Sequence, residues 1–385
     1  MFNKIAVLGA GHGGYAIAAD LSMVGYQVNL YELPEFYNSN LKPIIERGGI
    51  EVVAHTPEGK EFDLPAGGKS GFTKITGKIT TEMEVALEGV DLILLVVPSF
   101  GRERFIKEME SYIKEGQTII IYRKSFGALQ CNKILKDMGC KKDINICETE
   151  SLHYICKRIG PAKVLVKAKK DKMLFSVFPA KRTNKILEDI KKIYPQMIPA
   201  KNVLETTLAN NNPVVHPQSI LLNMHMVERK LFPYHETING GLCRNYGVTR
   251  GMAGVMEGID REKVALGKRL GLKIMKMKDA IKLYYGIDGS DLYEAIYNCF
   301  AYHTQLAPTS IKHRYVTEDV PYGLVPFASL GNQLEVPVPT IKAMATIGSA
   351  ATGIDFWNEG MTMEKLGLGN KSVKELHDFV ENGRQ

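Results

Sequence analysis

Residues 4–14 read Lys4-Ile5-Ala6-Val7-Leu8-Gly9-Ala10-Gly11-His12-Gly13-Gly14, and this stretch decides the fold. Its largely apolar first half predicts a buried strand. The alanine-rich residues 15–24 predict a helix that stops at Gly25. The glycines between them match the pattern Gly-x-Gly-x-x-Gly, which is informative only where, as here, it follows a strand and opens a helix.

Each residue of this turn has a physical role in a dinucleotide-binding fold. Gly9 permits the tight turn, Gly11 lets the backbone approach a pyrophosphate, and Gly14 lets the helix pack closely on the strand. His12 and Gly13 stand at the helix N-terminus, whose free N–H groups and positive dipole attract phosphates. We therefore predict that these five residues bind a cofactor; a tight turn without a ligand is the alternative.

Three more residues are predicted to contact the cofactor. Glu32 ends the strand at 27–31, roughly 20 residues past the glycines, where a carboxylate accepts the ribose hydroxyls of adenosine. Because it repels a 2′-phosphate, NAD(H) is favoured over NADP(H). Pro98 and Ser99 follow the apolar run at 92–97, where the ribose and nicotinamide are expected to pass. The alternatives are a solvated Glu32 and a simple strand exit.

The first part of the chain alternates β-rich runs with helical stretches, as in a parallel sheet covered on both faces. The run at 92–97 is almost continuously apolar, which a strand buried on both faces requires. Residues 118–121 predict another strand. Residues 163–168 and 173–178 predict two more, joined by a lysine-rich turn and paired antiparallel.

Beyond about residue 195, helical patterns replace the strand-like ones. Helices are predicted over 255–270, 291–306 and 340–351, with Ser290 as the N-cap of the second. The sequence thus predicts an α/β Rossmann-type doubly wound sheet followed by an all-α domain. Residues 1–197 form the first predicted domain and residues 198–385 the second, which suits a chain of 385 residues.

The balance of charged residues limits the classes of partner that we expect. The chain has 49 Lys and Arg against 42 Asp and Glu, a net charge of +7, in scattered positions. We expect no nucleic-acid partner; most of the excess is solvated surface, and a few positive groups face small anions. No apolar run approaches the roughly 18 residues that span a bilayer, and the N-terminus lacks the parts of a signal peptide. A cytoplasmic protein without a membrane partner is therefore expected.

The six cysteines predict no metal site, because no pair of them has the Cys-x-x-Cys spacing. Cys147, His153 and Cys156 lie close in sequence, yet their spacing fits no common ligand template. We expect buried, reduced thiols.

A candidate catalytic histidine lies in the segment Asn210-Asn211-Asn212-Pro213-Val214-Val215-His216-Pro217. Three asparagines and a proline are an unusual setting for a histidine of the core. An imidazole near its natural pKa can give and take a proton at pH 7. His216 is therefore the candidate, with a structural histidine as the alternative. Spacing does not exclude four other histidines, His225, His235, His303 and His313.

Residues 313–324 form a second candidate cluster, dense in groups that bind carboxylates or orient a base. Arg314 can grip a carboxylate with both arms of its guanidinium. Asp319 can hold a histidine in one tautomer, as the acid of a catalytic triad does. The alternative is an ion-pair network on the surface.

With these residues in view, the chain resembles the octopine/nopaline (opine) dehydrogenase family over nearly its whole length. The glycine turn is shared with many Rossmann enzymes and is not specific. The specific segments are NPVVHP (212–217), YGVT (246–249), RYVTEDVP (314–321), LVP (324–326), DFW (355–357) and EKLGL (364–368).

The resemblance implies a Rossmann domain followed by a helical domain of the 6-phosphogluconate-dehydrogenase-like type. It also implies a reaction: the amine of an amino acid joins a pyruvate-like 2-oxo acid, and NAD(P)H reduces the imine to an N-(carboxyalkyl)amino acid. His216 and Asp319 match the family's catalytic dyad, and Arg314 matches its carboxylate-binding arginine. Asn212 and Tyr322 are the other expected substrate-binding residues. A homodimer is an open alternative to a monomer.

Some questions stay open at this point. Tyr122-Arg123-Lys124-Ser125-Phe126-Gly127 stands where the family suggests a less charged turn, so Arg123 and Lys124 either reach an acidic substrate or face solvent. The alternative functions are a related dehydrogenase of a hydroxy acid or phosphorylated alcohol, and a non-catalytic NAD(P)-sensing protein. The family resemblance names neither the amino acid nor the 2-oxo acid.

Overall fold

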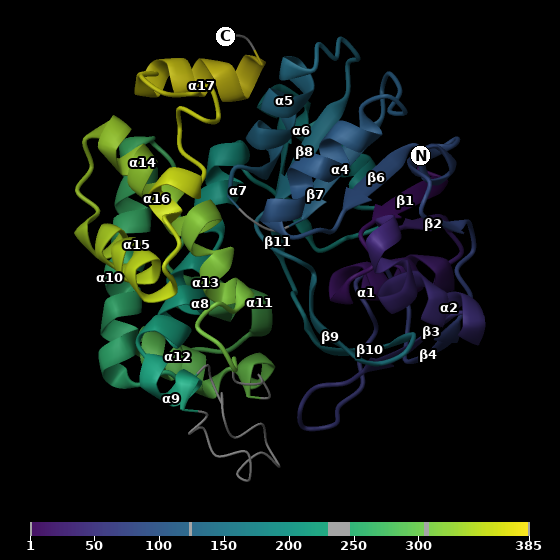
Figure 1. Cartoon of the computed structure of the whole chain (residues 1–385), viewed down its shortest axis with the longest axis horizontal. Coiled ribbons are helices and arrows are strands. Elements are labelled where there is room, and N and C mark those ends of the chain that lie inside the picture. Colours follow the sequence, from purple (N-terminus) through teal and green to yellow (C-terminus); the bar gives the residue numbers. More distant parts are fainter. Residues whose placement is uncertain (1, 123–124, 230–246, 304–307, 384–385) are drawn as a thin grey trace. The chain divides into compact units, whose positions relative to one another are not determined.

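The structure is a computed structural model that describes residues 2–122, 125–229, 247–303 and 308–383. It divides by internal contacts into two compact units (Figure 1). The sheet unit comprises the chain up to Thr206 together with Val380–Gly383, and the helical unit comprises Thr207–Phe379. The predicted boundary lies at 197/198. The sheet unit extends beyond this boundary to Thr206, whose Oγ1 donates to Glu148 Oε1 of that unit at 3.2 Å.

The main sheet has eight strands, in the order β12 (Met197–Pro199), β11 (Met173–Phe178), β8 (Asn145–Thr149), β7 (Thr118–Tyr122), β6 (Leu92–Leu95), β1 (Lys4–Leu8), β2 (Gln27–Tyr31) and β5 (Ile79–Thr80). Neighbouring strands are parallel except β11, which runs antiparallel to β8. Every residue of β6 and of β7 is buried, which explains their continuous apolar sequence. The predicted doubly wound sheet is confirmed.

The strand order reverses at β1, which lies between β2 and β6. In such sheets the ligand crevice opens at the carboxyl ends of the strands beside this reversal. The predicted glycine turn follows β1, Glu32 follows β2, and the Pro98–Ser99 pair comes shortly after β6. The topology therefore brings the three separate cofactor predictions to one edge of one sheet.

The helices of the sheet unit are α1 (His12–Met23), α2 (Lys42–Arg47), α3 (Met83–Leu87), α4 (Arg102–Met109), α5 (Gly127–Asp137) and α6 (Thr183–Ile190), and α7 (Val203–Ala209) spans the boundary. A second, four-stranded sheet of order β4 (Gly71–Thr73), β3 (Ile50–Ala54), β10 (Lys163–Lys169) and β9 (Tyr154–Gly160) packs on α1.

The second sheet explains why α1 is buried on nearly every side from Gly14 to Ser22. One acid lies in this buried stretch, Asp20, and its carboxylate is fully satisfied. It accepts from the backbone N–H groups of Ala66 and Gly68 and from the Tyr154 hydroxyl at 2.8 Å. The contact with Tyr154 fastens β9 to α1.

The predicted antiparallel pairing of residues 163–168 with 173–178 is wrong. Both segments are strands, but β10 pairs with β9 and β3 in the second sheet, whereas β11 pairs with β8 and β12 in the main sheet. An apolar pattern identifies a strand but does not show which strand it pairs with. It therefore could not distinguish a hairpin from two consecutive strands in different sheets.

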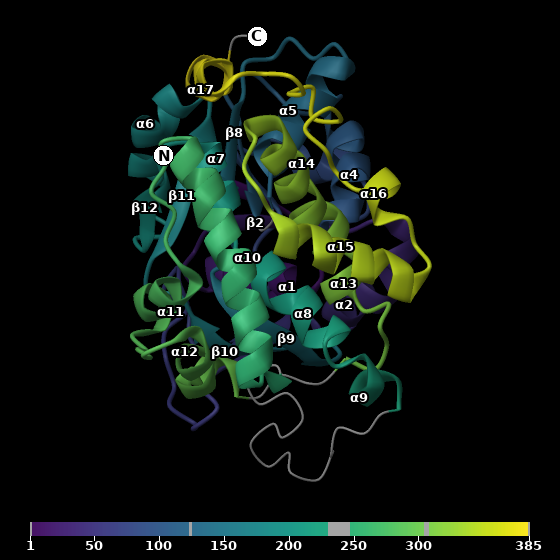
Figure 2. The same cartoon turned by 90° about the vertical axis from the view of Figure 1, so that its left-hand side faces the viewer.

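The helical unit consists of α8 (Asn212–Leu221), α9 (Met224–Glu228), α10 (Arg250–Arg269), α11 (Met277–Tyr285), α12 (Leu292–Asn298), α13 (Arg314–Thr317), η8 (Val320–Leu324), α14 (Val325–Leu334), α15 (Pro339–Thr352), α16 (Phe356–Glu359) and most of α17 (Val373–Asn382). Figure 2 shows the long α10 beside α14 and α15, with which it packs. The predicted helical domain is confirmed.

The boundaries of α12 correct two predictions. Asp291, not Ser290, caps α12, because its Oδ1 accepts from the backbone N–H of Glu294 at 2.8 Å. Helix α12 ends at Asn298, earlier than the predicted 306.

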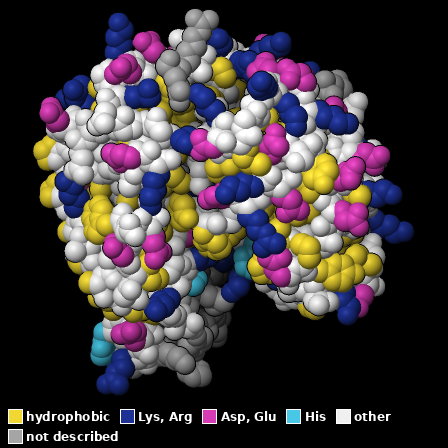
Figure 3. Space-filling model, turned by 45° about the horizontal axis from the view of Figure 1, so that its top comes forward, with side chains coloured by type: hydrophobic (Ala, Val, Ile, Leu, Met, Phe, Trp, Pro, Cys, Tyr) yellow, Lys and Arg dark blue, Asp and Glu magenta, His cyan; other side chains and the backbone are white. Residues whose placement is uncertain are grey.

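On the face drawn in Figure 3, Lys and Arg side chains are mixed with Asp and Glu over both units. A mixed surface of this kind is ordinary solvated surface. Within the described residues, no helix is both long and apolar enough to cross a membrane.

Candidate active site

The glycine turn after β1 is shaped by close backbone contacts. Gly9 has φ +100°, and a Cβ there would lie 2.6 Å from Val97 Cγ1. A Cβ on Gly14 would lie 1.8 Å from the carbonyl oxygen of Gly9, so only glycine fits. By contrast, a Cβ on Gly11 would meet nothing within 4 Å. The turn is thus closed against the sheet and open at Gly11, where a pyrophosphate would approach.

Glu32 is buried beside this turn, and most of its acceptor capacity is used. Oε2 accepts from the backbone N–H of Ala10 at 2.9 Å and from Asn40 Nδ2 at 2.8 Å. Oε1 accepts from the backbone N–H of Leu33 at 2.9 Å. A carboxylate has about four acceptor positions, so about one is left on Oε1 for a ribose hydroxyl.

The exit of β6 lies against the same turn. The backbone N–H of Val96 donates to Leu8 O at 2.9 Å, and Val97 is the residue that a Cβ on Gly9 would strike. Pro98 follows directly, and Ser99 begins the short η3 (Ser99–Gly101) as a buried residue. Both therefore belong to the edge of the sheet that carries the glycine turn.

His216 and Asp319 form a buried pair in the helical unit. His216 lies in α8 and Asp319 directly precedes η8, 103 residues later, yet Nδ1 and Oδ2 are 2.8 Å apart. Because a carboxylate only accepts, Nδ1 carries the hydrogen of this bond. The Tyr315 ring stacks on the imidazole, with centroids 3.9 Å apart and planes within 10°. The hydrogen bond to Asp319 and the stacked Tyr315 ring therefore both restrict the orientation of the imidazole.

The two residues that precede Tyr315 in the sequence, His313 and Arg314, also have defined contacts. His313 caps α13 by accepting from the backbone N–H of Tyr315 through Nδ1 at 3.3 Å. Burial lowers the pKa of His313 to about 4, and the charge of Arg314 adds to the effect. Arg314 pairs through Nε with the fully buried Glu318 at 3.4 Å. His313 is therefore neutral at pH 7, and the guanidinium of Arg314 is ion-paired with Glu318 through Nε.

The remaining candidates for substrate binding are Asn212, Tyr322, Arg123 and Lys124. The backbone N–H of Asn212 donates to Asn210 Oδ1 at 3.0 Å, while its buried side-chain nitrogen has no acceptor within the described part of the chain. Tyr322 is half-buried in η8, three residues after Asp319. Arg123 and Lys124 lie outside the described residues.

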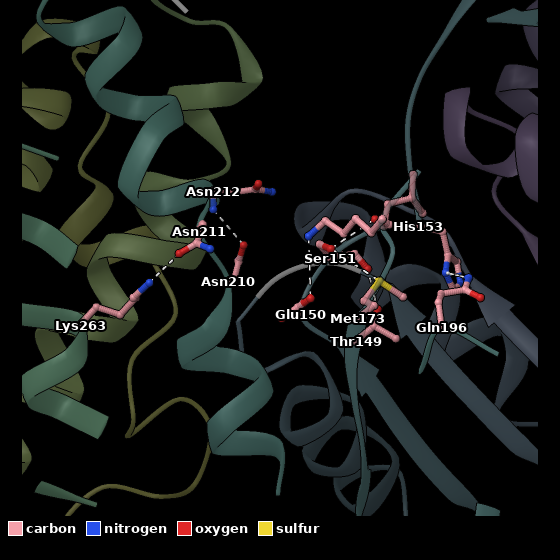
Figure 4. Close-up of polar contacts among 12 residues, drawn as sticks. Thr149, Glu150, Ser151, His153, Met173, Gln196, Asn210, Asn211, Asn212 and Lys263 are labelled. Carbon is pink, nitrogen blue, oxygen red and sulfur yellow. Dashed lines mark hydrogen bonds and ion pairs between the residues drawn. The ribbon is translucent and has the colours of Figure 1, made fainter. Parts of the chain in front are cut away.

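A buried lysine that sequence reasoning missed supports the start of α8. Lys263 on α10 is fully buried, and its Nζ lies 2.7 Å from Asp260 Oδ1. The same Nζ donates to Asn211 Oδ1 at 2.6 Å (Figure 4). Asn211 is the residue that precedes α8. The signal was present in the sequence, since Lys263 and Asp260 fall at helical spacing among Met256, Ile259 and Leu266 on the buried face.

The other histidines lie elsewhere. His225 is exposed on α9, His303 contacts Tyr297 O through Nε2 at 3.2 Å, and His235 lies outside the described residues. His153 belongs to the core of the sheet unit, where Nε2 lies 3.0 Å from the Tyr122 hydroxyl. Its Nδ1 lies 3.0 Å from Gln196 Nε2 (Figure 4). Burial lowers its pKa to about 3, so it is neutral.

The described cysteines, which exclude Cys243, are all free thiols. No cluster of three or more potential metal ligands occurs in the described ranges.

Gly323 allows η8 and α8, the segments next to Asp319 and around His216, to approach each other closely. A Cβ on Gly323 in η8 would lie 2.5 Å from Cγ of Pro213, a ring atom at the start of α8. We expect Gly323→Ala to push η8 away from α8 and to lower the free energy of unfolding by about 1–3 kcal/mol. Turnover should fall with it, because the His216–Asp319 distance changes. Denaturant unfolding and steady-state kinetics measure the two effects.

Gly254→Ala is the matched control, because a Cβ at this exposed helical position meets nothing within 4 Å. Its stability should stay equal or rise, since alanine favours a helix over glycine. Equal stability and turnover of the Gly323→Ala and Gly254→Ala variants would show that the approach of η8 to α8 does not matter.

Comparisons with known proteins show which sequences and structures this chain resembles. Residues 199–352 match the family model described as NAD/NADP octopine/nopaline dehydrogenase, alpha-helical domain. The chain is 33% identical to the opine dehydrogenase of Arthrobacter sp. (strain 1C) over 98% of both sequences.

Two solved structures are similar in fold. One is octopine dehydrogenase with NADH and L-arginine, with a TM-score of 0.75 at 19% identity, covering 99% of this chain and 98% of that one. The other is NADP⁺-bound yersinopine dehydrogenase, with a TM-score of 0.67 at 17% identity, covering 98% and 97%. Full-length identity to a curated relative, together with the matched helical domain, shows that this chain belongs to the octopine/nopaline (opine) dehydrogenase family.

Proposed function

We propose that this protein catalyses the NADH-dependent reductive condensation of an amino acid with a 2-oxo acid. The observation that carries the proposal is the buried contact of 2.8 Å between His216 and Asp319, in a unit that matches the family's helical domain. The solved octopine dehydrogenase binds NADH with L-arginine or with pyruvate, and these supply the two substrate classes.

In the proposed reaction, the amino nitrogen adds to the carbonyl carbon of the 2-oxo acid, water leaves, and the imine is reduced to a secondary amine. His216 gives a proton through Nε2 to the oxygen that leaves as water, and in the reverse direction it accepts the proton of the secondary amine. Asp319 keeps the hydrogen on Nδ1 and stabilises the imidazolium form. The stacked Tyr315 ring limits rotation of the imidazole.

The substrate carboxylates are assigned to nearby donors. Glu318 holds Arg314 by Nε, which orients the two terminal nitrogens for a bidentate bond to a carboxylate. The buried side-chain nitrogen of Asn212, without an acceptor in the described chain, is a second donor for substrate oxygen. Tyr322, close to Asp319 in sequence, is proposed to line the same site.

The sheet unit fits a nicotinamide dinucleotide. The open Cβ position of Gly11 leaves room at the N-terminus of α1 for the pyrophosphate. Gly9, His12, Gly13 and Gly14 form the rest of this turn. Glu32 offers an acceptor to the ribose, and Pro98 and Ser99 lie beside them at the exit of β6. When bound, the cofactor supplies the hydride that reduces the imine carbon.

Replacing Glu32 by serine should raise the KM for NADH by about 10-fold or more and reduce the preference over NADPH. The loss comprises one charge-assisted bond to ribose, the repulsion of a 2′-phosphate, and the bonds by which Glu32 holds Ala10, Leu33 and Asn40. Steady-state kinetics with both cofactors measures the two effects. Glu35→Ser is the control, because Glu35 is an exposed acid of the short helix η1 (Pro34–Phe36) and pairs with Arg104. An unchanged preference in Glu32→Ser would remove this residue from cofactor selection.

A matrix of amino acids against pyruvate, 2-oxobutyrate, glyoxylate and 2-oxoglutarate tests the proposed function. We expect NADH oxidation only where both partners are present. Oxidation with an oxo acid alone would instead indicate a hydroxy-acid dehydrogenase. Binding of NADH without oxidation by any pair would indicate a sensing protein. A cytoplasmic location and a homodimer stay predictions.

A further inference from the structure

Arg158, on a strand outside the glycine-turn motif, lies beside the proposed cofactor site. It belongs to β9 of the second sheet, which packs on α1 and is fastened there by the hydrogen bond from Tyr154 to Asp20. The backbone N–H of Arg158 donates to Nδ1 of His12, in the glycine turn, at 3.2 Å. The second sheet therefore brings Arg158 to the N-terminal turn of α1.

The guanidinium is held in a fixed place above this helix. It lies over the Tyr15 ring, with its carbon 5.1 Å from the ring centroid. Its Nη1 donates to Ser39 O at 3.1 Å and to Asn40 Oδ1 at 2.7 Å. These two bonds come from Nη1, and the Arg158 side chain also makes a hydrogen bond to the Tyr15 phenol. A guanidinium offers five N–H donors, so these three bonds leave about two of them for a ligand.

Asn40 connects this guanidinium to the ribose-binding carboxylate. Its side-chain oxygen accepts from Arg158, and its side-chain nitrogen donates to Oε2 of Glu32 at 2.8 Å. The charges of Arg158 and Glu32 both act on the Tyr15 phenol, whose pKa burial raises. Arg158 is thus one side chain away from the group proposed to bind the adenosine ribose.

In the part of the chain that the structure describes, the charge of Arg158 has no carboxylate as a direct counter-charge. Within the described ranges, no carboxylate lies at ion-pair distance from its guanidinium, although the side chain is half-buried. Ordered, partly buried guanidinium groups recognise phosphates with two parallel bonds. The position, the fixed orientation and the missing anion all indicate a phosphate ligand.

We propose that Arg158 binds a phosphate on the adenosine half of the dinucleotide, with Asn40 positioning both Arg158 and Glu32. This inference rests on the proposed use of a nicotinamide dinucleotide. The phosphate belongs either to the pyrophosphate, common to both cofactors, or to the 2′-phosphate of NADPH. The positive charge would act on affinity for every cofactor in the first case, and on cofactor choice in the second.

Calorimetric titration of the full chain with AMP, ADP and adenosine 2′,5′-bisphosphate separates these cases. Arg158→Gln should bind the relevant phosphate compound about 10- to 100-fold more weakly, the value of a charge-assisted hydrogen bond. An equal loss for AMP and ADP, with none for adenosine, indicates the adenosine-side phosphate of the pyrophosphate. A specific loss for the 2′,5′-bisphosphate relative to AMP indicates the 2′-phosphate. Arg158→Lys should recover part of the affinity, because it keeps the charge and loses the fork.

Lys157→Gln is the matched control, since it removes one positive charge from the neighbouring residue, whose side chain leaves the strand on the other face. It should leave all affinities unchanged. Unchanged phosphate binding in Arg158→Gln, or an equal loss for adenosine itself, would overturn the role of Arg158. Failure of the unaltered protein to bind ADP or NADH would overturn the proposed function as well.

Discussion

Replacing His216 by alanine is expected to lower turnover by about 10²- to 10⁴-fold, the usual contribution of general acid–base catalysis. His216 pairs with the buried carboxylate of Asp319, with Nδ1 at 2.8 Å from Oδ2. Its removal takes away the proton donor for the leaving water and the acceptor for the secondary amine. Stopped-flow and steady-state measurements of NADH oxidation record the loss.

Two controls make this result specific. The affinity for NADH, measured by fluorescence titration, should stay at the level of the unaltered protein, because the proposed cofactor-binding residues lie in the sheet unit. His313→Asn should retain most activity, since burial lowers the pKa of His313 to about 4 and it is neutral at pH 7. Near-normal turnover in a folded His216→Ala protein would contradict the proposed chemistry.

Asp319→Asn is expected to cause the second large loss, up to about 10⁴-fold, as for the equivalent change in catalytic triads. The amide keeps the size of the carboxylate and removes its charge. It can neither stabilise an imidazolium nor hold the hydrogen on Nδ1 as a carboxylate does. The predicted signature is a fall in kcat with little change in the affinity for NADH.

The double variant His216→Ala/Asp319→Asn tests whether the two residues act as one unit. Residues that act together are strongly non-additive, so the double variant should be about as slow as His216→Ala alone. Losses that multiply would show that Asp319 acts independently of His216. Circular dichroism of each variant excludes unfolding as the cause.

The local parts of the fold were predictable because they follow from short sequence patterns. Steric limits at Gly9 and Gly14 determine the glycine turn, and continuous apolar residues identify β6 and β7. The strand order then explains why the glycine turn, Glu32 and Ser99 lie at the same edge of the sheet. Each of these features depends on residues close together in the chain.

The parts that could not be predicted depend on contacts between residues that are far apart in the sequence. His216 and Asp319 are 103 residues apart, and only the family resemblance linked them beforehand. Arg158 meets Asn40 across 118 residues, through a second sheet whose pairing the apolar pattern did not reveal. The contact of Lys263 with Asn211 depends on how α10 packs on α8. Spacing along the chain carries no information about such contacts.

The central claim is that both substrates enter one product and that hydride reaches the carbon that joins them. NADH dideuterated at C4 of the nicotinamide, an amino acid and a 2-oxo acid should yield a secondary amine that contains both carbon skeletons. Mass spectrometry should find one deuterium on the former carbonyl carbon. Deuterium in a 2-hydroxy acid, with no product that contains the amino acid, would contradict the account.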